Sequence, residues 1–331
     1  MSRIISIIIA FVVCLSAIPA LAGTITVTAV GDILPQASWR KTAPSISRLF
    51  AGVQKRLRKA DIVIGNLETP LTCSVEPTPN KDPELIKAKR DFVFRCDRPK
   101  AACAMKDAGF TVLTLANNHM MDYGDDGLAD TLDRLDEVGI PHAGAGGDET
   151  DARMPAVLDV KGRRVIVFSA SDIVPQGYGA DEDGPGIASM KDESGLLEAV
   201  AVARDEYPDA LILLSLHWGV EATFEPTERQ RRVAHMLIDC GADAIFGHHP
   251  HRIQPVEMYR GRPVFYSLGN FQFATKDDGA DSVIVTVAFP DGPDPKIRYT
   301  IRPVAISRNG VPRILGKKEP GYWKIMGEIG R

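Results

Sequence analysis

The sequence predicts a layered α/β fold. Short apolar runs alternate with amphipathic segments along most of the chain, a rhythm typical of buried strands covered by helices. Five of the apolar runs end in turns that carry histidine or carboxylate side chains: TAVGD, IVIGNLE, TLANNH, LLSLHWGVE and AIFGHHPH. These turns hold five of the seven histidines of the chain. Strand ends that converge in this way are typical of a metal site at one edge of a sheet.

The first half of the chain alternates strands and helices. Residues 23–30 alternate apolar and polar side chains and predict the first strand. Residues 45–60 have helical apolar spacing and end in basic residues, which suit the carboxyl terminus of a helix. The same criteria predict, in order, a strand over 61–65, a polar surface loop over 72–90, a helix over 97–107, a strand over 111–116 and a helix over 125–138.

The second half begins with the same rhythm and then changes. The pattern predicts a strand over 165–169, a helix over 194–206, a strand over 210–216, a helix over 226–240 and a strand over 244–246. After about Val256 helical patterns become rare, and strands are predicted over 263–268, 282–289 and 296–304. We expect these last strands to form a second, largely antiparallel sheet packed on the first. Residues 23–331 are predicted to be one domain, with a β-rich extension over 279–331.

The first 22 residues have the features of an export signal. Arg3 supplies a positive charge, residues 4–18 are almost wholly apolar, and Ala20-Leu21-Ala22 has the small-x-small form of a signal peptidase site. The apolar run is short for a membrane span and precedes a helix-breaking proline. We expect cleavage after Ala22 and a location in the periplasm or cell envelope. The alternative is an uncleaved N-terminal anchor.

Composition and cysteine content narrow the class of protein. A hydrophobic content of 44% and a charged content of 25% are typical of a globular protein with an ample core. The formal net charge of −4 argues against a general nucleic-acid surface. Cys73 and Cys96 flank a polar loop, and in an oxidising compartment we expect them to form a disulfide.

The five turns offer side chains that hold divalent metal ions. Asp32 and Glu68 supply hard carboxylates, and one carboxylate can bridge two ions. The NNH triplet offers an amide oxygen beside an imidazole. Three further imidazoles occur within four residues: His248, His249 and His251. Taken alone, Asp32 could be a helix cap and the NNH triplet a turn. Close imidazoles would repel one another if protonated, and metal binding removes that repulsion.

These motifs together resemble the CapA family, which is associated with poly-γ-glutamate and capsule synthesis. The resemblance rests on GD32, GNLE68, NNH119 followed by MDYG, HWGVE221, GHHPH251 and YSLGNF271 in this order, and runs from about Ile25 to Phe273. That family is similar to the calcineurin-like metallophosphoesterases. The resemblance therefore implies a four-layer α/β/β/α sandwich, metallophosphatase-like, with a metal site at the strand ends.

The resemblance also implies a role for each residue of the motifs. One metal would be held by Asp32, Glu68 and His251, and the other by Glu68, Asn118, His217 and His249. His119 matches the catalytic histidine, and Asp122, three residues later, would orient its imidazole. Asn117 and Asn270 would support the ligands. The expected cofactor is one or two divalent ions, with Mn, Zn or Fe as candidates.

The sequence departs from the metallophosphoesterase pattern at two positions. Leu34 stands where the first motif has a histidine, so the first metal loses a protein ligand. Glu68 replaces an aspartate, and the added methylene shifts any bridging geometry. Either the first metal binds weakly, or another group such as Glu221 or His248 compensates.

Two functions fit this set of residues. The first is an exported metal-dependent hydrolase or transferase of the phosphoesterase type, acting on a phosphoester or on poly-γ-glutamate itself. The second is a non-catalytic, metal-containing factor that binds the anionic polymer and helps its export. Capsule-synthesis membrane proteins are possible partners, and no nucleic acid is expected. An anionic partner is also favoured by basic residues of the 81–100 loop: Lys81, Lys87, Lys89, Arg90 and Arg95.

Overall fold

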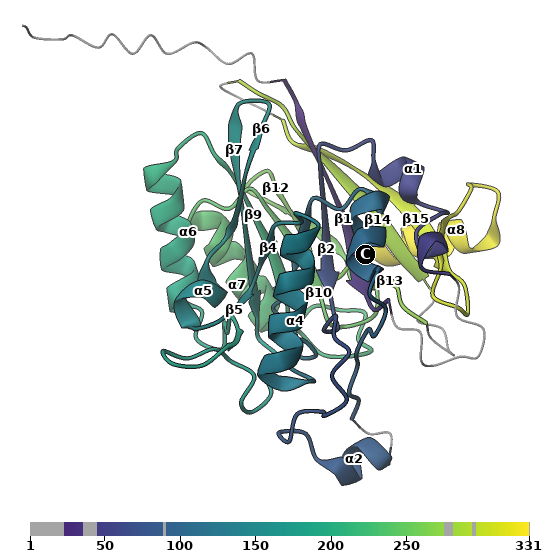
Figure 1. The fold of residues 1–331 in the computed structure, drawn as a ribbon. Helices are drawn as coiled ribbons and strands as arrows, with labels where there is room; N and C mark the ends of the chain where they lie inside the picture. Colours follow the sequence, from purple (N-terminus) through teal and green to yellow (C-terminus); the bar gives the residue numbers. More distant parts are fainter. Residues whose placement is uncertain (1–22, 36–44, 89–90, 275–280, 293–295, 331) are drawn as a thin grey trace, which may run out of the picture.

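The structure is a computed structural model that describes residues 23–35, 45–88, 91–274, 281–292 and 296–330 (Figure 1). Two large β-sheets pack face to face, and helices cover their outer faces. The first sheet has the strand order β16-β15-β14-β1-β2-β3-β4, and β13 pairs with β1 beside it. The second sheet has the order β11-β12-β10-β9-β7-β6. A small third sheet pairs β5 with β8.

The first sheet is parallel at its centre and antiparallel toward one edge. The strands β1, β2, β3 and β4 run parallel to one another, whereas β14, β15 and β16 continue the sheet with antiparallel pairs. Its strands are β1 (Ile25–Ile33), β2 (Ile62–Leu67), β3 (Val112–Thr114), β4 (His142–Ala143), β13 (Asn270–Gln272), β14 (Asp281–Phe289), β15 (Arg298–Ile306) and β16 (Pro312–Ile314).

The second sheet is built around the parallel pairs of β7, β9, β10 and β12. Antiparallel partners close both of its edges. Its strands are β6 (Ala156–Val160), β7 (Arg163–Ser171), β9 (Leu211–His217), β10 (Ala244–His248), β11 (Val256–Tyr259) and β12 (Arg262–Phe265). The small sheet consists of β5 (Ala145–Gly146) and β8 (Gly186–Ile187).

The helices lie mostly between successive strands, as a βαβ arrangement requires. They are α1 (Gln54–Leu57), α2 (Pro83–Lys87), α3 (Ala101–Ala108), α4 (Gly124–Glu137), α5 (Glu149–Arg153), α6 (Ser194–Glu206), α7 (Glu228–Asp239) and α8 (Pro320–Ile329), together with a 3₁₀ helix η1 (Ile46–Arg48). In α7 the Thr227 hydroxyl and the Gln230 side chain form a capping box, which fixes where the helix begins. No helix in the described parts of the chain is long and apolar enough to cross a membrane.

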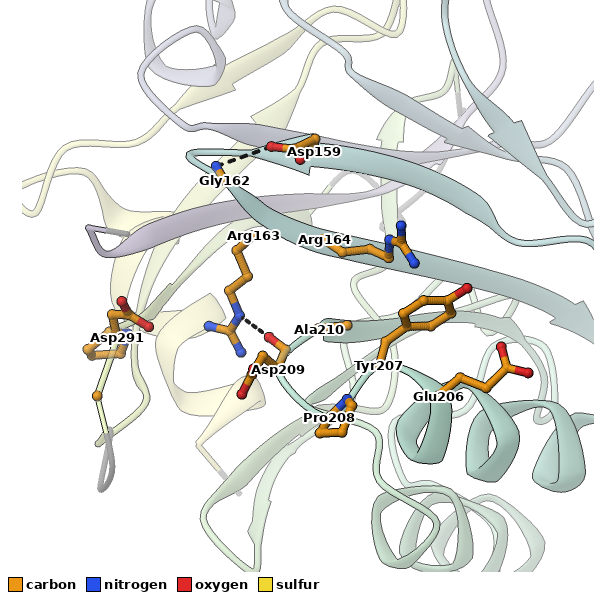
Figure 2. Close-up of a pocket in the computed structure, with 12 residues that line it drawn as sticks. Asp159, Gly162, Arg163, Arg164, Glu206, Tyr207, Pro208, Asp209, Ala210 and Asp291 are labelled. Atoms are coloured by element: carbon orange, nitrogen blue, oxygen red, sulfur yellow. Dashed lines mark hydrogen bonds between the residues drawn. The ribbon is translucent and has the colours of Figure 1, made fainter. Parts of the chain in front are cut away.

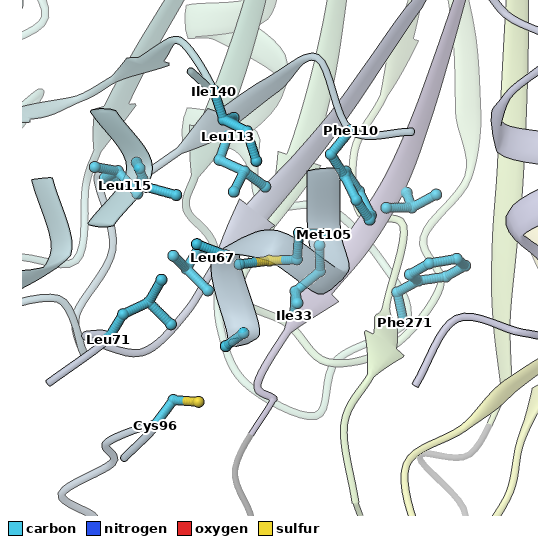
Figure 3. Close-up of a cluster of buried hydrophobic side chains, with 14 of the residues drawn as sticks. Ile33, Leu67, Leu71, Cys96, Met105, Phe110, Leu113, Leu115, Ile140 and Phe271 are labelled. Atoms are coloured by element: carbon cyan, nitrogen blue, oxygen red, sulfur yellow. The ribbon is translucent and has the colours of Figure 1, made fainter. Parts of the chain in front are cut away.

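Alternate side chains of each central strand enter different apolar layers. In β9, Leu211 and Leu213 pack between the sheets, whereas Ile212 and Leu214 pack under α6 and α7. The layer on the outer side of the first sheet joins Ile33 and Leu113 to Met105 of α3 (Figure 3). Because strand side chains alternate, a sheet covered on both faces must be apolar throughout. The order is therefore helix, sheet, sheet, helix, which confirms the four-layer α/β/β/α sandwich.

The last strands do not form a sheet of their own, and this prediction was wrong. Strand β14 pairs directly with β1, from Ile25 opposite Phe289 to Val30 opposite Ile284. The strands after residue 279 therefore extend the first sheet, while β11 and β12 extend the second. The C-terminal helix α8 was not predicted, and it packs Ile325 and Ile329 into the layer between the sheets. An alternating pattern identifies a strand but not the strand edge with which it pairs.

The helix predicted over residues 45–60 is broken. It consists of η1 and the four-residue α1, separated by a turn that contains Gly52. A Cβ atom at this glycine would lie 2.6 Å from the backbone oxygen of Pro312. The close approach of β16 therefore requires glycine here and interrupts the helix.

Cys73 and Cys96 are not bonded in the structure: Cys73 is exposed beside Arg134, and the buried Cys96 thiol donates to the Pro35 carbonyl at 3.2 Å. Burial raises the pKa of the Cys96 thiol to about 11. The expected disulfide is therefore absent, because spacing along the chain does not set the separation of two side chains.

The predicted signal peptide, residues 1–22, lies outside the described residues.

Candidate metal centre

The predicted strand ends meet at one edge of the two sheets. Asp32 lies near the end of β1, and Glu68 directly follows β2. From the second sheet, His217 ends β9 and His248 ends β10, and these two residues are in register. The remaining donors follow β3 and β10: Asn118, His249 and His251. Carboxyl ends of strands in both sheets thus supply the site, which neither sheet could form alone.

The donor atoms fall into two groups that share Glu68. Asp32, Glu68 and His251 form one group, and Glu68, His217 and His249 form the other, with ligand atoms within 4.8 Å of one another in each. His217 Nε2 lies 3.6 Å from Glu68 Oε1, and His251 Nε2 lies 3.7 Å from the same atom. Asn118 Oδ1 is 2.8 Å from His217 Nε2. The structure thus groups the same residues that the family resemblance divides between two metals, and each group can hold an ion.

Glu68 is the buried charge that most needs a cation. Its side chain is fully buried, and neither carboxylate oxygen has a hydrogen-bond partner among the described residues. Burial and the charge of Asp32 raise its pKa well above the ordinary value. An unpaired buried carboxylate is costly unless a cation compensates it. A divalent ion between the imidazoles would supply that compensation, so the residues present fit a metal.

Asp32 is held in its ionised form by histidines. It accepts hydrogen bonds from Asn66 Nδ2 and from His248 Nδ1, both at 2.9 Å, and it lies 3.4 Å from His251 Nδ1. Burial opposes ionisation, but the bonds and charges of His248 and His251 outweigh it and hold the pKa of Asp32 well below its usual value. His248, expected as a substitute ligand, therefore contacts Asp32 through Nδ1. Its Nε2 is buried and has no partner within the described chain.

The imidazoles of the second group face one another. His217 Nε2 and His249 Nδ1 are 3.2 Å apart. Burial and the neighbouring His249 lower the pKa of His217 well below its ordinary value, and burial and His251 lower that of His249 to about 3. Both are therefore neutral at pH 7, the form in which histidine binds a metal.

The His251 imidazole faces the carboxylates of both Asp32 and Glu68. Burial opposes a positive charge on this ring, but the carboxylates of Glu68 and Asp32 outweigh it and raise the pKa of His251 to about 10. The same two carboxylates that hold a proton on this ring would hold a cation between them. Metal binding would then displace that proton, as expected for a histidine ligand.

The backbone of the GHHPH loop is shaped to present these rings. His249 and His251 have φ angles of 95° and 53°. This left-handed region is energetically unfavourable for any residue that carries a side chain. Just before them, a Cβ atom at Gly247 would lie 1.9 Å from the Tyr266 carbonyl oxygen, so only glycine fits. Asn270 then accepts from His251 Nδ1 at 2.8 Å. Strain of this kind is found where function requires a particular geometry.

His119 belongs to a buried network beside the donors. His119 Nδ1 is 2.8 Å from Asp122 Oδ2, and this carboxylate also accepts from the Tyr178 hydroxyl and pairs with Lys81 Nζ, each at 2.8 Å. Burial opposes ionisation of Asp122, but His119 and Lys81 outweigh it and lower its pKa. Burial lowers the pKa of His119. Asp122 thus orients His119, and Lys81 of the polar loop points inward instead of toward a partner.

Three residues contribute to the site but were not predicted as site residues from the sequence: Asn66, Lys81 and Tyr178. Asn66 bonds Asp32 and lies 3.4 Å from His217 Nδ1, and Asn117 Nδ2 donates to Asn66 Oδ1 at 3.1 Å. Asn66 lies within the quoted GNLE motif and could have been found there. Lys81 and Tyr178 reach the site from loops whose course the sequence does not fix.

Two candidates stay outside the donor groups. Glu221 is exposed in the turn after β9, and it acts on Glu68 and His251 through its charge. It belongs to neither group of donors found among the described residues. Leu34 is 5% exposed, and its backbone N–H donates to the Gln272 carbonyl at 2.7 Å.

A large cavity of about 750 Å³ lies at the opposite end of the strands (Figure 2). Arg163 and Arg164 begin β7 there, and Tyr207 to Ala210 precede β9. The seven residues of β9 separate this cavity from His217 by about 20 Å. Arg163 Nε donates to the Asp209 carbonyl, and Arg164 stacks on Tyr207. Both arginine side chains of this cavity therefore already have partners within the protein. None of the candidate donors lines this cavity.

Fold and site together define a four-layer α/β/β/α protein with a candidate divalent-metal centre at the strand ends. The family model described as bacterial capsule synthesis protein PGA_cap matches residues 26–275. The chain therefore belongs to this family, which confirms the CapA resemblance.

Several curated proteins are similar to this chain. The capsule biosynthesis protein CapA of Bacillus anthracis is 35% identical over 258 residues, covering 75% of this chain and 60% of that protein. The PGA biosynthesis protein CapA of Bacillus subtilis (strain 168) is 34% identical over 250 residues, covering 74% and 62%. A probable polyglutamine synthesis accessory protein of Mycobacterium tuberculosis is 35% identical over 218 residues, covering 63% and 55%. The chain thus spans less than two thirds of the length of each of these relatives. A crystal structure of TT1561 from Thermus thermophilus superposes with a TM-score of 0.41 at 12% identity, over 80% of this chain and 93% of that one.

Proposed function

We propose that this protein is an exported, metal-dependent hydrolase or transferase of the phosphoesterase type that acts in poly-γ-glutamate capsule synthesis. The observation that carries the proposal is the buried Glu68 carboxylate, which lacks a hydrogen-bond partner among the described residues and lies between two groups of donors. The names of the relatives from Bacillus support the role in capsule synthesis. The substrate would be a phosphoester or the γ-glutamyl polymer.

The donor set suggests which ions fit. Imidazole and carboxylate ligands together suit Mn, Zn or Fe better than the all-oxygen sites of calcium. Asp32, Glu68 and His251 would hold one ion, and Glu68, Asn118, His217 and His249 the other. An ion held there would act as a Lewis acid toward a phosphoryl or carbonyl oxygen.

The protein's own groups would move the proton. With Nδ1 of His119 bonded to Asp122, Nε2 is the ring atom left to exchange a proton with the substrate. Asp122 in turn is fixed by Lys81 and Tyr178, so the imidazole keeps one orientation. The Phe94 ring is tilted against the His119 ring, with 4.4 Å between the two centroids, and limits the exposure of the imidazole to water.

Turnover of p-nitrophenyl phosphate esters with added Mn²⁺ tests the proposal. We expect hydrolysis by the wild-type protein, its loss with a chelator, and its return when Mn²⁺ is restored. The variant His217→Ala should be inactive, because it removes the histidine that faces His249. Metal-loaded, folded protein without turnover of mono- and diesters would rule out a phosphoesterase.

A second candidate function is favoured by Leu34. If the missing histidine marks lost chemistry, the metal cleft would bind polymer carboxylates and help export without catalysis.

We expect Leu34→His to raise occupancy of the group formed by Asp32, Glu68 and His251, and to increase phosphoesterase turnover. Metal titration and a melting curve on the same variant measure this. Leu34→Gln is the matched control, since it introduces a polar side chain that is a poor ligand.

The alternative result for Leu34→His is loss of stability alone. A buried polar group without a partner costs roughly 1–3 kcal/mol. If the variant is folded and its metal affinity equals that of the wild type, the alignment of the first motif is wrong. The first metal group should then be rebuilt around Glu221 or His248.

The proposed location is the periplasm or cell envelope, with processing after Ala22. Small residues at positions 20 and 22 fit the signal peptidase pattern. Mass spectrometry of protein from the cell envelope should find Gly23 as the first residue, and an intact peptide beginning at Met1 would contradict this.

A further inference from the structure

Five basic side chains gather on the outer side of the first sheet. Lys55, Arg56 and Lys59 come from α1 and the turn after it, and Arg298 and Arg302 from β15. Figure 1 shows α1 beside β14 and β15. Two cavities of about 270 and 350 Å³ open here, and both are lined by Arg56 and Lys59. We call these five residues the basic face.

Among the residues that the structure describes, no carboxylate pairs with the charges of the basic face. The nearby Asp61 bonds Thr26 and is already paired with Lys161 at 2.8 Å. Burial and the like charge of Arg302 lower the pKa of Arg56. In a protein of net charge −4, this local excess of positive charge requires an explanation.

Arg56 shows where an acceptor is missing. Its Nη2 donates to Thr286 Oγ1 at 3.0 Å, which holds the guanidinium against the sheet. Its Nε is buried and has no acceptor in the described structure. A guanidinium presents its donors in a fixed fork that matches a carboxylate.

The basic side chains of β15 form a row along the strand. Arg298, Thr300 and Arg302 are alternate residues of β15 and are exposed on one side, whereas Tyr299 and Ile301 pack toward the layer between the sheets. The two arginines are therefore about 13 Å apart along the strand. A row of this length suits an extended chain with repeated charges better than a single small anion.

We infer that the basic face binds a linear polycarboxylate, as a docking surface distinct from the candidate metal centre. The identity of the polymer, poly-γ-glutamate, rests on the proposed function. Carboxylates match the donors of the arginines and of the neighbouring threonine hydroxyls. Single-stranded nucleic acid would require aromatic side chains for stacking. Tyr299, the one aromatic side chain among the described residues that line these two cavities, packs into the protein interior instead.

One cavity of the basic face and the metal centre share strand β1. Thr28, which lines the cavity, precedes Asp32 by four residues on β1, a distance of about 13 Å along the strand. A bound polymer would thus be retained near the donors while its end is processed or passed on.

Binding of fluorescent poly-γ-glutamate to the full chain tests this inference. We expect Arg298→Gln/Arg302→Gln to weaken binding roughly five- to tenfold at low salt, and Lys55→Gln/Lys59→Gln to act in the same direction. The matched control, Arg164→Gln/Arg260→Gln, removes the same charge from β7 and from the turn between β11 and β12, and should change binding less than twofold. Binding by the wild type should also weaken steeply as salt rises.

Further variants and a competition experiment test polymer binding at the basic face separately from the proposed phosphoesterase activity. His217→Ala/His249→Ala should keep polymer binding at the basic face while losing phosphoesterase turnover. If that variant loses polymer binding and the arginine variant keeps it, the polymer binds only at the metal centre and the inference is overturned. It is also overturned if a single-stranded oligonucleotide competes as well as poly-γ-glutamate does, or if the wild type binds no polymer. Phosphoesterase turnover of the arginine variant should remain unchanged on a small ester.

Discussion

The double variant His249→Ala/His251→Ala should lose the transition metal that we expect the purified protein to carry. Each imidazole serves one of the two donor groups, and each approaches the shared Glu68 carboxylate or faces His217. Water cannot replace a nitrogen ligand at equal affinity. Elemental analysis should find at least about one ion per wild-type chain and a small fraction of that in the variant.

A matched control is available elsewhere in the chain. His142→Ala/His235→Ala removes two histidines that contact Asp136 and Glu257 at distant positions on the fold. We expect this control to keep its metal. A folded His249→Ala/His251→Ala protein with full occupancy would mean that the ion is held elsewhere.

Replacing His119 by alanine should lower phosphoesterase turnover roughly 10²–10⁴-fold while leaving metal content unchanged. His119 lies beside the donors but bonds Asp122, so its loss removes proton transfer and not a ligand. The measurements are kcat for a p-nitrophenyl ester and metal content of the same sample. Lys81→Met should cause a smaller loss of kcat, because it removes one of the partners of Asp122 and leaves the imidazole in place.

His142→Ala is again the control, since that histidine is exposed to solvent in part and contacts only the exposed Asp136 in the described network. Loss of metal from His119→Ala would assign this ring to the ligands. Turnover equal to that of the wild type would remove His119 from the catalytic step.

Local sequence pattern predicts many of the helices and strands. The predictions that were wrong concern contacts between residues far apart in the sequence. The helix α6 begins and ends at the predicted residues, Ser194 and Glu206, because its apolar spacing is regular. The strand β14 was also predicted, but its partner β1 is more than 250 residues away in sequence. Nothing in the alternation of β14 distinguishes that edge from any other. The break at Gly52 likewise depends on the approach of β16.

The same distinction applies to the site. Asp32, Glu68 and His217 were predicted because strands deliver their end residues to a common edge, a rule that needs no knowledge of loops. Lys81 was predicted to favour an anionic partner, yet it is buried against Asp122. The course of the loop that carries it depends on contacts with Phe92 and Tyr178, which sequence spacing does not encode.

The division of the donors between two sheets makes metal affinity and sheet packing interdependent. An ion bound by Glu68, His217 and His249 would be a cross-link between layers that also meet through apolar side chains and through hydrogen bonds such as that of Thr114 with Ser215. Its affinity would then depend on how the sheets are aligned, and its binding would add to the free energy of unfolding by mass action, about 4 kcal/mol at a thousandfold excess over Kd. Substitutions deep between the sheets, at Val285 for example, would act on the ion at a distance, without touching any ligand.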